Sequence, residues 1–175
     1  MSGKNRHLRG DINAIIAPVH SYHEVEAGDL MVLNAVAGMC GTGGTADNYA
    51  FPFDEVKTAA ASGAVASAGF IYTYFLGVAM EDSPSGVTEN ITIAQSGVFR
   101  YPMHSAYIGS AVTIGALVSA VSNTLAAGVS EQVVCTNATS PVSSTAYLGY
   151  IVKTESGASF VDFELRTPYM YGRAS

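Results

Sequence analysis

Charged side chains are scarce in this sequence. Only 13% of its 175 residues are Asp, Glu, Lys or Arg, and 49% are apolar, whereas a typical soluble domain is about 25% charged. A chain of this length is expected to form one domain with a sizeable core and needs no disulfide bonds for stability. Its surface must still be covered, so we expect an obligate oligomer or a protein partly buried by a partner.

Cysteine is also rare, and no secretory leader is recognisable. Cys40 and Cys135 lie far apart and form neither a CxxC pair nor a zinc-ligand spacing, so both are expected to be reduced thiols. The opening residues, MSGKNRHLRGDIN, lack the apolar segment that a signal peptide requires. We therefore expect the protein to be made in a cytoplasm and kept there until assembly.

Signatures of catalysis and of cofactor binding are missing as well. The glycine-rich stretch 38–48, GMCGTGGTADN, lacks the Lys-Ser or Lys-Thr that completes a phosphate-binding loop, and no GxSxG nucleophile elbow occurs. His20 and His23 could share a metal on a helix, but they would point to opposite faces of a strand. We predict that the protein is not an enzyme and has no cofactor, no metal site and no catalytic residue.

Two long uncharged stretches, 58–80 and 101–130, are long enough to cross a bilayer. Both are rich in Gly, Ser, Thr and Ala and have no leucine-rich centre, so they would be weak membrane spans. Buried strands or assembly contacts explain them better, and no membrane partner is expected.

The few basic residues are unevenly distributed. Lys4, Arg6 and Arg9 lie in the first ten residues, which contain no acid, and the rest of the chain has 14 acidic residues against 5 basic ones, a net charge of about −9. A basic tip on an acidic body suggests an arm that reaches an acidic surface, although chain ends are often simply solvated. The acidic body argues against nucleic acid as a partner. We expect an extended arm over 1–12 and a single β domain over 13–175.

Alternation of apolar and polar residues predicts an all-β fold. The stretch 75–102 is expected to form a hairpin whose second arm bends at Gly97, because a glycine within a strand marks a bend or a close backbone approach. The segment 160–166 alternates cleanly, as a half-buried strand does. One short helix is expected over 54–61, where Asp54 can act as N-cap ahead of an alanine run. The predicted architecture is a small β-barrel or β-tulip-like domain.

Two distant segments show internal sequence similarity. FLGVAMEDSPSG at 75–86 resembles YLGYIVKTESGA at 147–158, with the two leucines 72 residues apart. A glycine-led strand precedes each, GDLMVL at Gly28 and GSAVTI at Gly109. Two related halves would be a simple way to close one small barrel, in which a glycine early in each strand permits a bend or a close crossing. Chance patterning of hairpins is the alternative.

The order of these motifs resembles that of tailed-bacteriophage capsid decoration, or cement, proteins of a small all-β group. The resemblance covers about 25–168, without the glycine-rich loop and much of 119–146. It rests on short segments in a fixed order: VEAGDLMVLN, FLGVAMEDSPSG, ITIAQSGVFRYP, GSAVTIGA, YLGYIVKTESG and FVDFELRTP.

The resemblance implies a homotrimer on the exterior of an icosahedral virion, where it clamps neighbouring major capsid protein subunits. Terminal arms often make this clamp, so Lys4, Arg6 and Arg9 are the expected capsid-contact residues. The segments 38–48 and 54–68 depart from the family's simplest pattern, which leaves the trimer contacts open. The main alternative is a carbohydrate- or receptor-binding β-domain of a fibre or adhesin, which would present some of the ten tyrosines. An enzyme on a β-barrel and a structural oligomer outside viruses are further alternatives.

Overall fold

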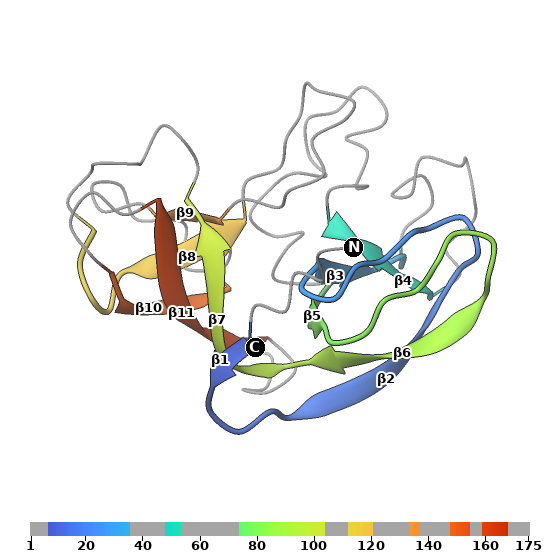
Figure 1. Cartoon of the computed structure of the whole chain (residues 1–175), viewed down its shortest axis with the longest axis horizontal. Helices are drawn as coiled ribbons and strands as arrows, with labels where there is room; N and C mark the ends of the chain where they lie inside the picture. Colours follow the sequence, from blue (N-terminus) through green and yellow to red (C-terminus); the bar gives the residue numbers. More distant parts are fainter. Residues whose placement is uncertain are drawn as a thin grey trace.

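A computed structural model of the chain describes residues 7–35, 48–53, 74–103, 112–120, 134–136, 148–154 and 159–167 (Figure 1). These residues form strands and their connections, and no helix occurs among them. The expected helix over 54–61 and nearly all of the glycine-rich stretch 38–48 lie outside the described residues. The strands are β1 His7–Arg9, β2 Ala14–Val19, β3 Leu30–Leu33, β4 Ala50–Pro52, β5 Phe75–Ala79, β6 Glu89–Ala94, β7 Ser96–Pro102, β8 Leu117–Ala120, β9 Val134–Thr136, β10 Gly149–Lys153 and β11 Phe160–Arg166.

The strands form two sheets. Five of them close into a barrel in the order β2-β4-β3-β5-β6, and six form an open sheet in the order β1-β7-β11-β10-β8-β9. Figure 1 shows the barrel on the right and the open sheet on the left, joined where β6 passes into β7. The prediction of an all-β fold with a small barrel is confirmed. The expected hairpin is formed by β5 and β6. Its second arm is divided at Gln95, where the chain leaves the barrel for the second sheet, and Gly97 lies within β7 with a φ of 126°.

Five strands of the open sheet repeat the arrangement of the five barrel strands. Strands β7 to β11 occupy the places of β2 to β6, in the same order and with matching register. We call 14–94 the first unit and 98–166 the second unit. Aligning their registers gives the equivalent pairs Ile15/Phe99, Ile16/Arg100, Ala17/Tyr101, Pro18/Pro102, Leu30/Leu117, Met31/Val118, Val78/Tyr150, Ile93/Phe163 and Ala94/Glu164.

The turns before β3 and β8 match as well. The Gly28 N–H donates to the Ala79 carbonyl at 2.7 Å, and the Gly115 N–H donates to the Ile151 carbonyl at 2.8 Å. Both glycines have positive φ, 100° and 87°, a conformation that favours glycine. The counterpart of Gly28 is therefore Gly115, and the expectation that it is Gly109 is wrong. The expectation that two halves close one barrel is also wrong, because each unit forms its own sheet.

The glycine of each Leu-Gly pair allows two strands to approach closely. A Cβ at Gly77 would overlap the carbonyl oxygen of Ala94 and lie 3.1 Å from the Ile93 side chain. A Cβ at Gly149 would overlap the carbonyl oxygen of Glu164 and lie 3.1 Å from the Phe163 side chain. The interpretation of these glycines as sites of close crossing is confirmed at both places.

Side-chain size differs between the inner faces of the two units. The first unit closes into a ring through one parallel pair, Val19 with Ala50. Five inner positions of the second unit carry larger side chains, since Phe99, Tyr101, Met103, Ile151 and Phe163 stand for Ile15, Ala17, Val19, Ala79 and Ile93, while Val118 and Val161 are smaller than the equivalent Met31 and Ile91. We infer that these larger side chains would overfill a five-stranded ring, so the second unit stays open.

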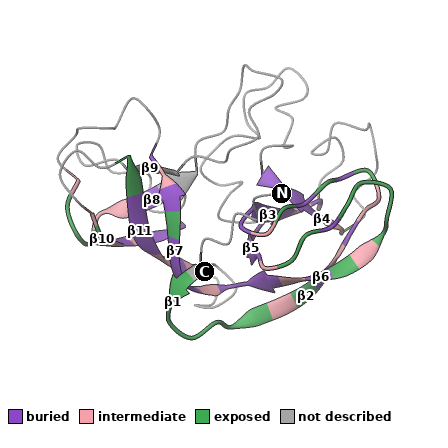
Figure 2. Cartoon of the chain, viewed as in Figure 1, coloured by how far each residue is buried: buried purple, intermediate pink, exposed green. Residues whose placement is uncertain are grey.

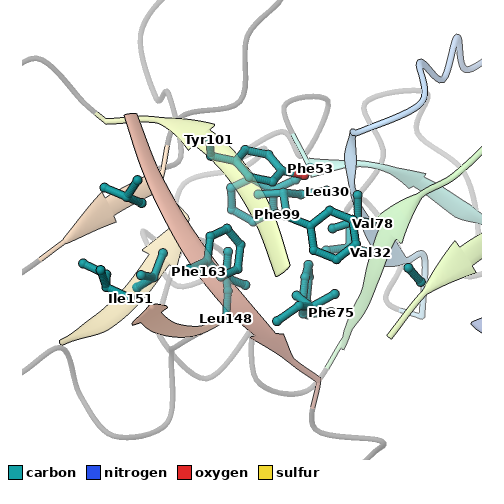
Figure 3. Close-up of a cluster of buried hydrophobic side chains, with 14 of the residues drawn as sticks. Leu30, Val32, Phe53, Phe75, Val78, Phe99, Tyr101, Leu148, Ile151 and Phe163 are labelled. Atoms are coloured by element: carbon teal, nitrogen blue, oxygen red, sulfur yellow. The ribbon is translucent and has the colours of Figure 1, made fainter. Parts of the chain in front are cut away.

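The outer face of the first unit fills the opened second unit. Leu30, Val32, Phe75 and Val78 pack in one buried cluster with the inner face of the second unit, and Figure 3 shows them beside Phe99, Tyr101 and Phe163. The buried Tyr101 hydroxyl also donates to the Gly28 carbonyl at 2.6 Å, across the two units. The two units therefore share one core, although only the first has a closed interior of its own.

Candidate functional site

The N-terminal segment lies along the junction of the two units. Strand β1 pairs antiparallel with β7 in a register that shifts between His7 and Arg9. Beyond it, Gly10 adopts a φ of 91° and lies against the backbone of Gly97. A chain that carried a side chain at Gly10 would be strained here, so this glycine permits the turn from β1 toward β2.

Three hydrogen bonds fasten the segment to the connection between β6 and β7. The Asn13 N–H donates to Ser96 Oγ at 2.8 Å, and the Ser96 hydroxyl donates to the Asp11 carbonyl at 3.0 Å. The Gln95 N–H donates to the Asn13 carbonyl at 2.6 Å. The chain therefore passes from the second unit at β1 into the first unit at β2. Along this path it is bonded to the β6–β7 connection, which passes from the first unit into the second.

The structure places one of the three expected contact residues. Arg9 is exposed at the end of β1, and Lys4 and Arg6 lie outside the described residues. Arg9 is thus held on a paired strand at the edge of the second sheet, with its side chain accessible to a partner. Its role in binding a capsid stays a prediction.

Large apolar side chains are exposed along the same segment. Leu8, Ile12 and Ile16 all lie open to solvent, and Ile16 is 74% exposed in the middle of β2. Figure 2 shows this exposed stretch running along β1 and β2. No charged residue occurs between Ile12 and Val19. We call the exposed side chains of Leu8, Arg9, Ile12 and Ile16 the N-terminal surface.

The repeat shows that the fold does not require an apolar residue at position 16. The equivalent residue in the second unit is Arg100, which forms a two-pronged ion pair with Asp162 at 2.7 and 3.0 Å. Arg100 faces Asp162 across the strands as Ile16 faces Thr92. A polar pair is therefore compatible with this position, and the first unit exposes an isoleucine there instead.

Ile12 and Ile16 were not predicted as functional residues from the sequence. The available signal is the run AIIA at 14–17, in which apolar residues occupy both alternating sets of a strand. One set must face outward when the other faces a core. An unbroken apolar run on a strand with only one buried face therefore predicts an exposed apolar side chain.

The described residues offer no metal centre and no apolar helix. No group of three His, Cys, Asp or Glu side chains in the described part of the chain is placed to hold a metal ion. His23 is buried and stacks on Phe51 at 5.5 Å, while His20 lies between Tyr22 and Tyr49. Within the same residues, no helix has the length and apolar character needed to cross a bilayer.

Comparison with known proteins finds no matching family model, no matching curated protein and no matching solved structure. The segments behind the resemblance to decoration proteins include strands β3, β5, β6, β7, β10 and β11. These strands build the two cores, so a likeness confined to them concerns the fold. A function has to be argued from the surface.

Proposed function

We propose that the protein is a decoration protein of a tailed-phage head. It binds the outer surface of the assembled icosahedral shell and clamps neighbouring major capsid subunits. The observation that carries the proposal is the N-terminal surface, where exposed Leu8, Ile12 and Ile16 accompany Arg9 on one segment. Apolar anchors beside a basic residue suit a partner surface that is apolar at its centre and acidic at its rim.

The binding energy of this surface would stabilise the shell by mass action. Burying one Leu or Ile side chain fully contributes about 1.5–3 kcal/mol, and part of that gain is lost to ordering on association. A protein that binds only the assembled shell shifts the equilibrium toward that state. A shell offers many neighbouring sites, so even a modest affinity at each site gives substantial total stabilisation.

A homotrimer would add avidity, because three linked N-terminal surfaces could engage neighbouring capsid subunits together. The scarcity of charged side chains, 13% of the chain, fits burial between subunits. Mass measurement in solution should give three times the 18.1 kDa of one chain. A monomeric mass at micromolar concentration would contradict the trimer and would leave shell binding to be tested separately.

Co-sedimentation with purified heads of the virus that encodes the chain tests the proposal. The informative variant is Ile16→Arg, which places a charge at the most exposed apolar residue of the N-terminal surface and copies the equivalent residue of the second unit. The matched control is Ile114→Arg, because Ile114 is similarly exposed, 71%, but lies in the turn before β8. We expect Ile16→Arg to reduce head binding at least about tenfold and Ile114→Arg to leave it unchanged. Equal binding by both variants would contradict this use of the surface.

A carbohydrate- or receptor-binding domain is the second candidate. The observation that favours it is Tyr22, which is 66% exposed in a loop of the barrel.

A further inference from the structure

Three aromatic rings meet at the end of β2. The rings of His20 and Tyr22 stack with centroids 4.1 Å apart and planes 20° apart. Tyr49 meets the other side of this pair, its ring centroid 5.2 Å from that of His20 at an angle of 69°. Since Tyr22 is 66% exposed, His20 supports one face of its ring and leaves the opposite face open. A tyrosine ring of this kind presents an apolar face and a polar hydroxyl to a ligand.

The backbone around these rings is held in place. The His23 N–H donates to the His20 carbonyl at 3.0 Å, which closes a turn around Tyr22. The Tyr22 N–H approaches His20 Nδ1 at 3.3 Å. Tyr22 is thus oriented before any ligand arrives, and a ligand would meet little conformational cost.

A neighbouring loop reinforces the turn. The Gly86 N–H donates to the Ser21 carbonyl at 2.7 Å, and the Ser21 N–H donates to the Thr88 hydroxyl at 3.2 Å. The loop also brings the exposed side chain of Val87 to the same end of the barrel. The rings therefore lie in a rigid setting of two loops, with a further apolar side chain close by.

The charges nearby restrict the ligand. The described residues of the first unit contain no Lys or Arg, and Lys57 is the only Lys or Arg in the sequence between 11 and 94. Glu24 is exposed two residues after Tyr22, and Glu89 is the register partner of Val19, the residue before His20. This acidic setting repels phosphate, sulfate and nucleic acid. It offers carboxylate acceptors to hydroxyl donors.

We propose that the ring cluster of His20, Tyr22 and Tyr49 is a binding platform for a neutral pyranose sugar. One face of a pyranose ring presents C–H groups, which pack on the open face of Tyr22. Its hydroxyl groups reach outward and donate hydrogen bonds to the carboxylates. A few placed polar groups around an apolar contact are the usual composition of a small-ligand site.

The platform begins at the residue after β2, whereas the N-terminal surface runs from β1 to Ile16 in the middle of β2. Leu8, Arg9 and Ile12 lie before the other end of β2, whose six residues span about 20 Å, and Figure 1 shows β2 extending from the junction of the units to the far side of the barrel. A shell contact made mainly by Leu8, Arg9 and Ile12 would keep the platform accessible. The platform does not depend on shell binding, and either function could fail alone.

The test is binding of the full-length protein to an array of neutral glycans, followed by titration of the best ligand by NMR. Tyr22→Ala should raise the dissociation constant about tenfold or more, and Tyr22→Phe should preserve binding because it keeps the ring. Phe160→Ala is the matched control, since Phe160 is another exposed aromatic residue, 51%, on β11 of the second unit. It should bind as the unchanged protein does.

Circular dichroism confirms that each variant is folded. Binding of no neutral glycan, or equal binding by Tyr22→Ala and the unchanged protein, would overturn the proposal. A preference for a quaternary ammonium compound over every sugar would overturn it too, because the site would then be an aromatic and acidic cage for a cation. Co-sedimentation of Tyr22→Ala with heads separates the two functions, since shell binding should be unaffected.

Discussion

Gly77 and Gly149 occupy equivalent positions in the two units, 72 residues apart in the sequence. Each lies on a strand whose backbone passes so close to its neighbour that a Cβ would overlap a carbonyl oxygen, that of Ala94 in one unit and that of Glu164 in the other. The same close crossing at matching register positions indicates that the chain contains two copies of one five-stranded unit, which differ in side-chain size.

Replacing either glycine by alanine should destabilise the protein strongly. Gly149→Ala introduces a methyl group against the Glu164 carbonyl, so the strands must separate, and we expect the free energy of unfolding to fall by about 2–4 kcal/mol. Gly77→Ala should cost at least as much, because Gly77 also has a φ of 145°. Urea unfolding measures both values.

Gly86→Ala is the control for these two variants. Gly86 has a φ of 96° but nothing within 4 Å of the added Cβ, so only backbone strain of about 1–2 kcal/mol is expected. If Gly149→Ala proves no more destabilising than Gly86→Ala, the close crossing is not a constraint on the fold.

Tyr101→Phe tests the contact between the units. The buried Tyr101 hydroxyl donates to the Gly28 carbonyl at 2.6 Å. Removing the hydroxyl deletes this hydrogen bond to the carbonyl. We expect a loss of about 1–2 kcal/mol in unfolding free energy with no change in secondary structure. Tyr22→Phe removes a hydroxyl from an exposed ring and should cost almost nothing. Equal stability of the two variants would show that the hydroxyl does not join the units.

Ile93→Phe tests why only the first unit closes. Ile93 lies inside the barrel, and its equivalent in the open unit is Phe163. The larger ring should overfill the barrel and lower the unfolding free energy by about 1–3 kcal/mol. Ile16→Phe, on the outside of the neighbouring strand, should change stability by less than about 0.5 kcal/mol. A barrel that accepts Phe at 93 without loss would contradict the size argument.

Deleting residues 1–12 should leave a folded protein that binds heads far less well. The deletion removes β1 and the three bases Lys4, Arg6 and Arg9 but leaves both cores intact. Replacing the three basic residues by glutamine removes their charge but keeps the backbone contacts of the arm. The loss of head binding should be largest at low salt, where exposed charges are least screened. Head occupancy that is unchanged after the deletion would show that the arm makes no contact.

Much of the fold could be predicted from the sequence where local pattern and tertiary contact agree. Alternation located β6 and β11, and the two Leu-Gly pairs identified equivalent strands, because close crossing permits only glycine there. The partner of Gly28 was misassigned, since GSAVTI and GALVSA at 109–120 both look like a glycine-led strand. Only the register shows that Gly115 takes the place of Gly28.

The relation between the units could not be predicted, because it depends on volumes that meet only in three dimensions. Phe99 and Tyr101 read as ordinary strand residues, yet they are larger than Ile15 and Ala17 at the equivalent positions, and the sheet that carries them is open and packs against the first unit. The candidate site was predicted in part. The basic residues were visible as a charge cluster, whereas the exposure of Ile16 became apparent only when β2 was placed against β6.

Cryo-electron microscopy tests the proposed shell binding most directly, with heads of a tailed phage whose genome carries this sequence, stripped and then incubated with the purified protein. Decoration predicts added density on the outside of the shell at its threefold and quasi-threefold positions, with the N-terminal surface toward the capsid and the Ile16→Arg variant at much lower occupancy. Heads that show no added density at saturating protein would contradict the proposed function.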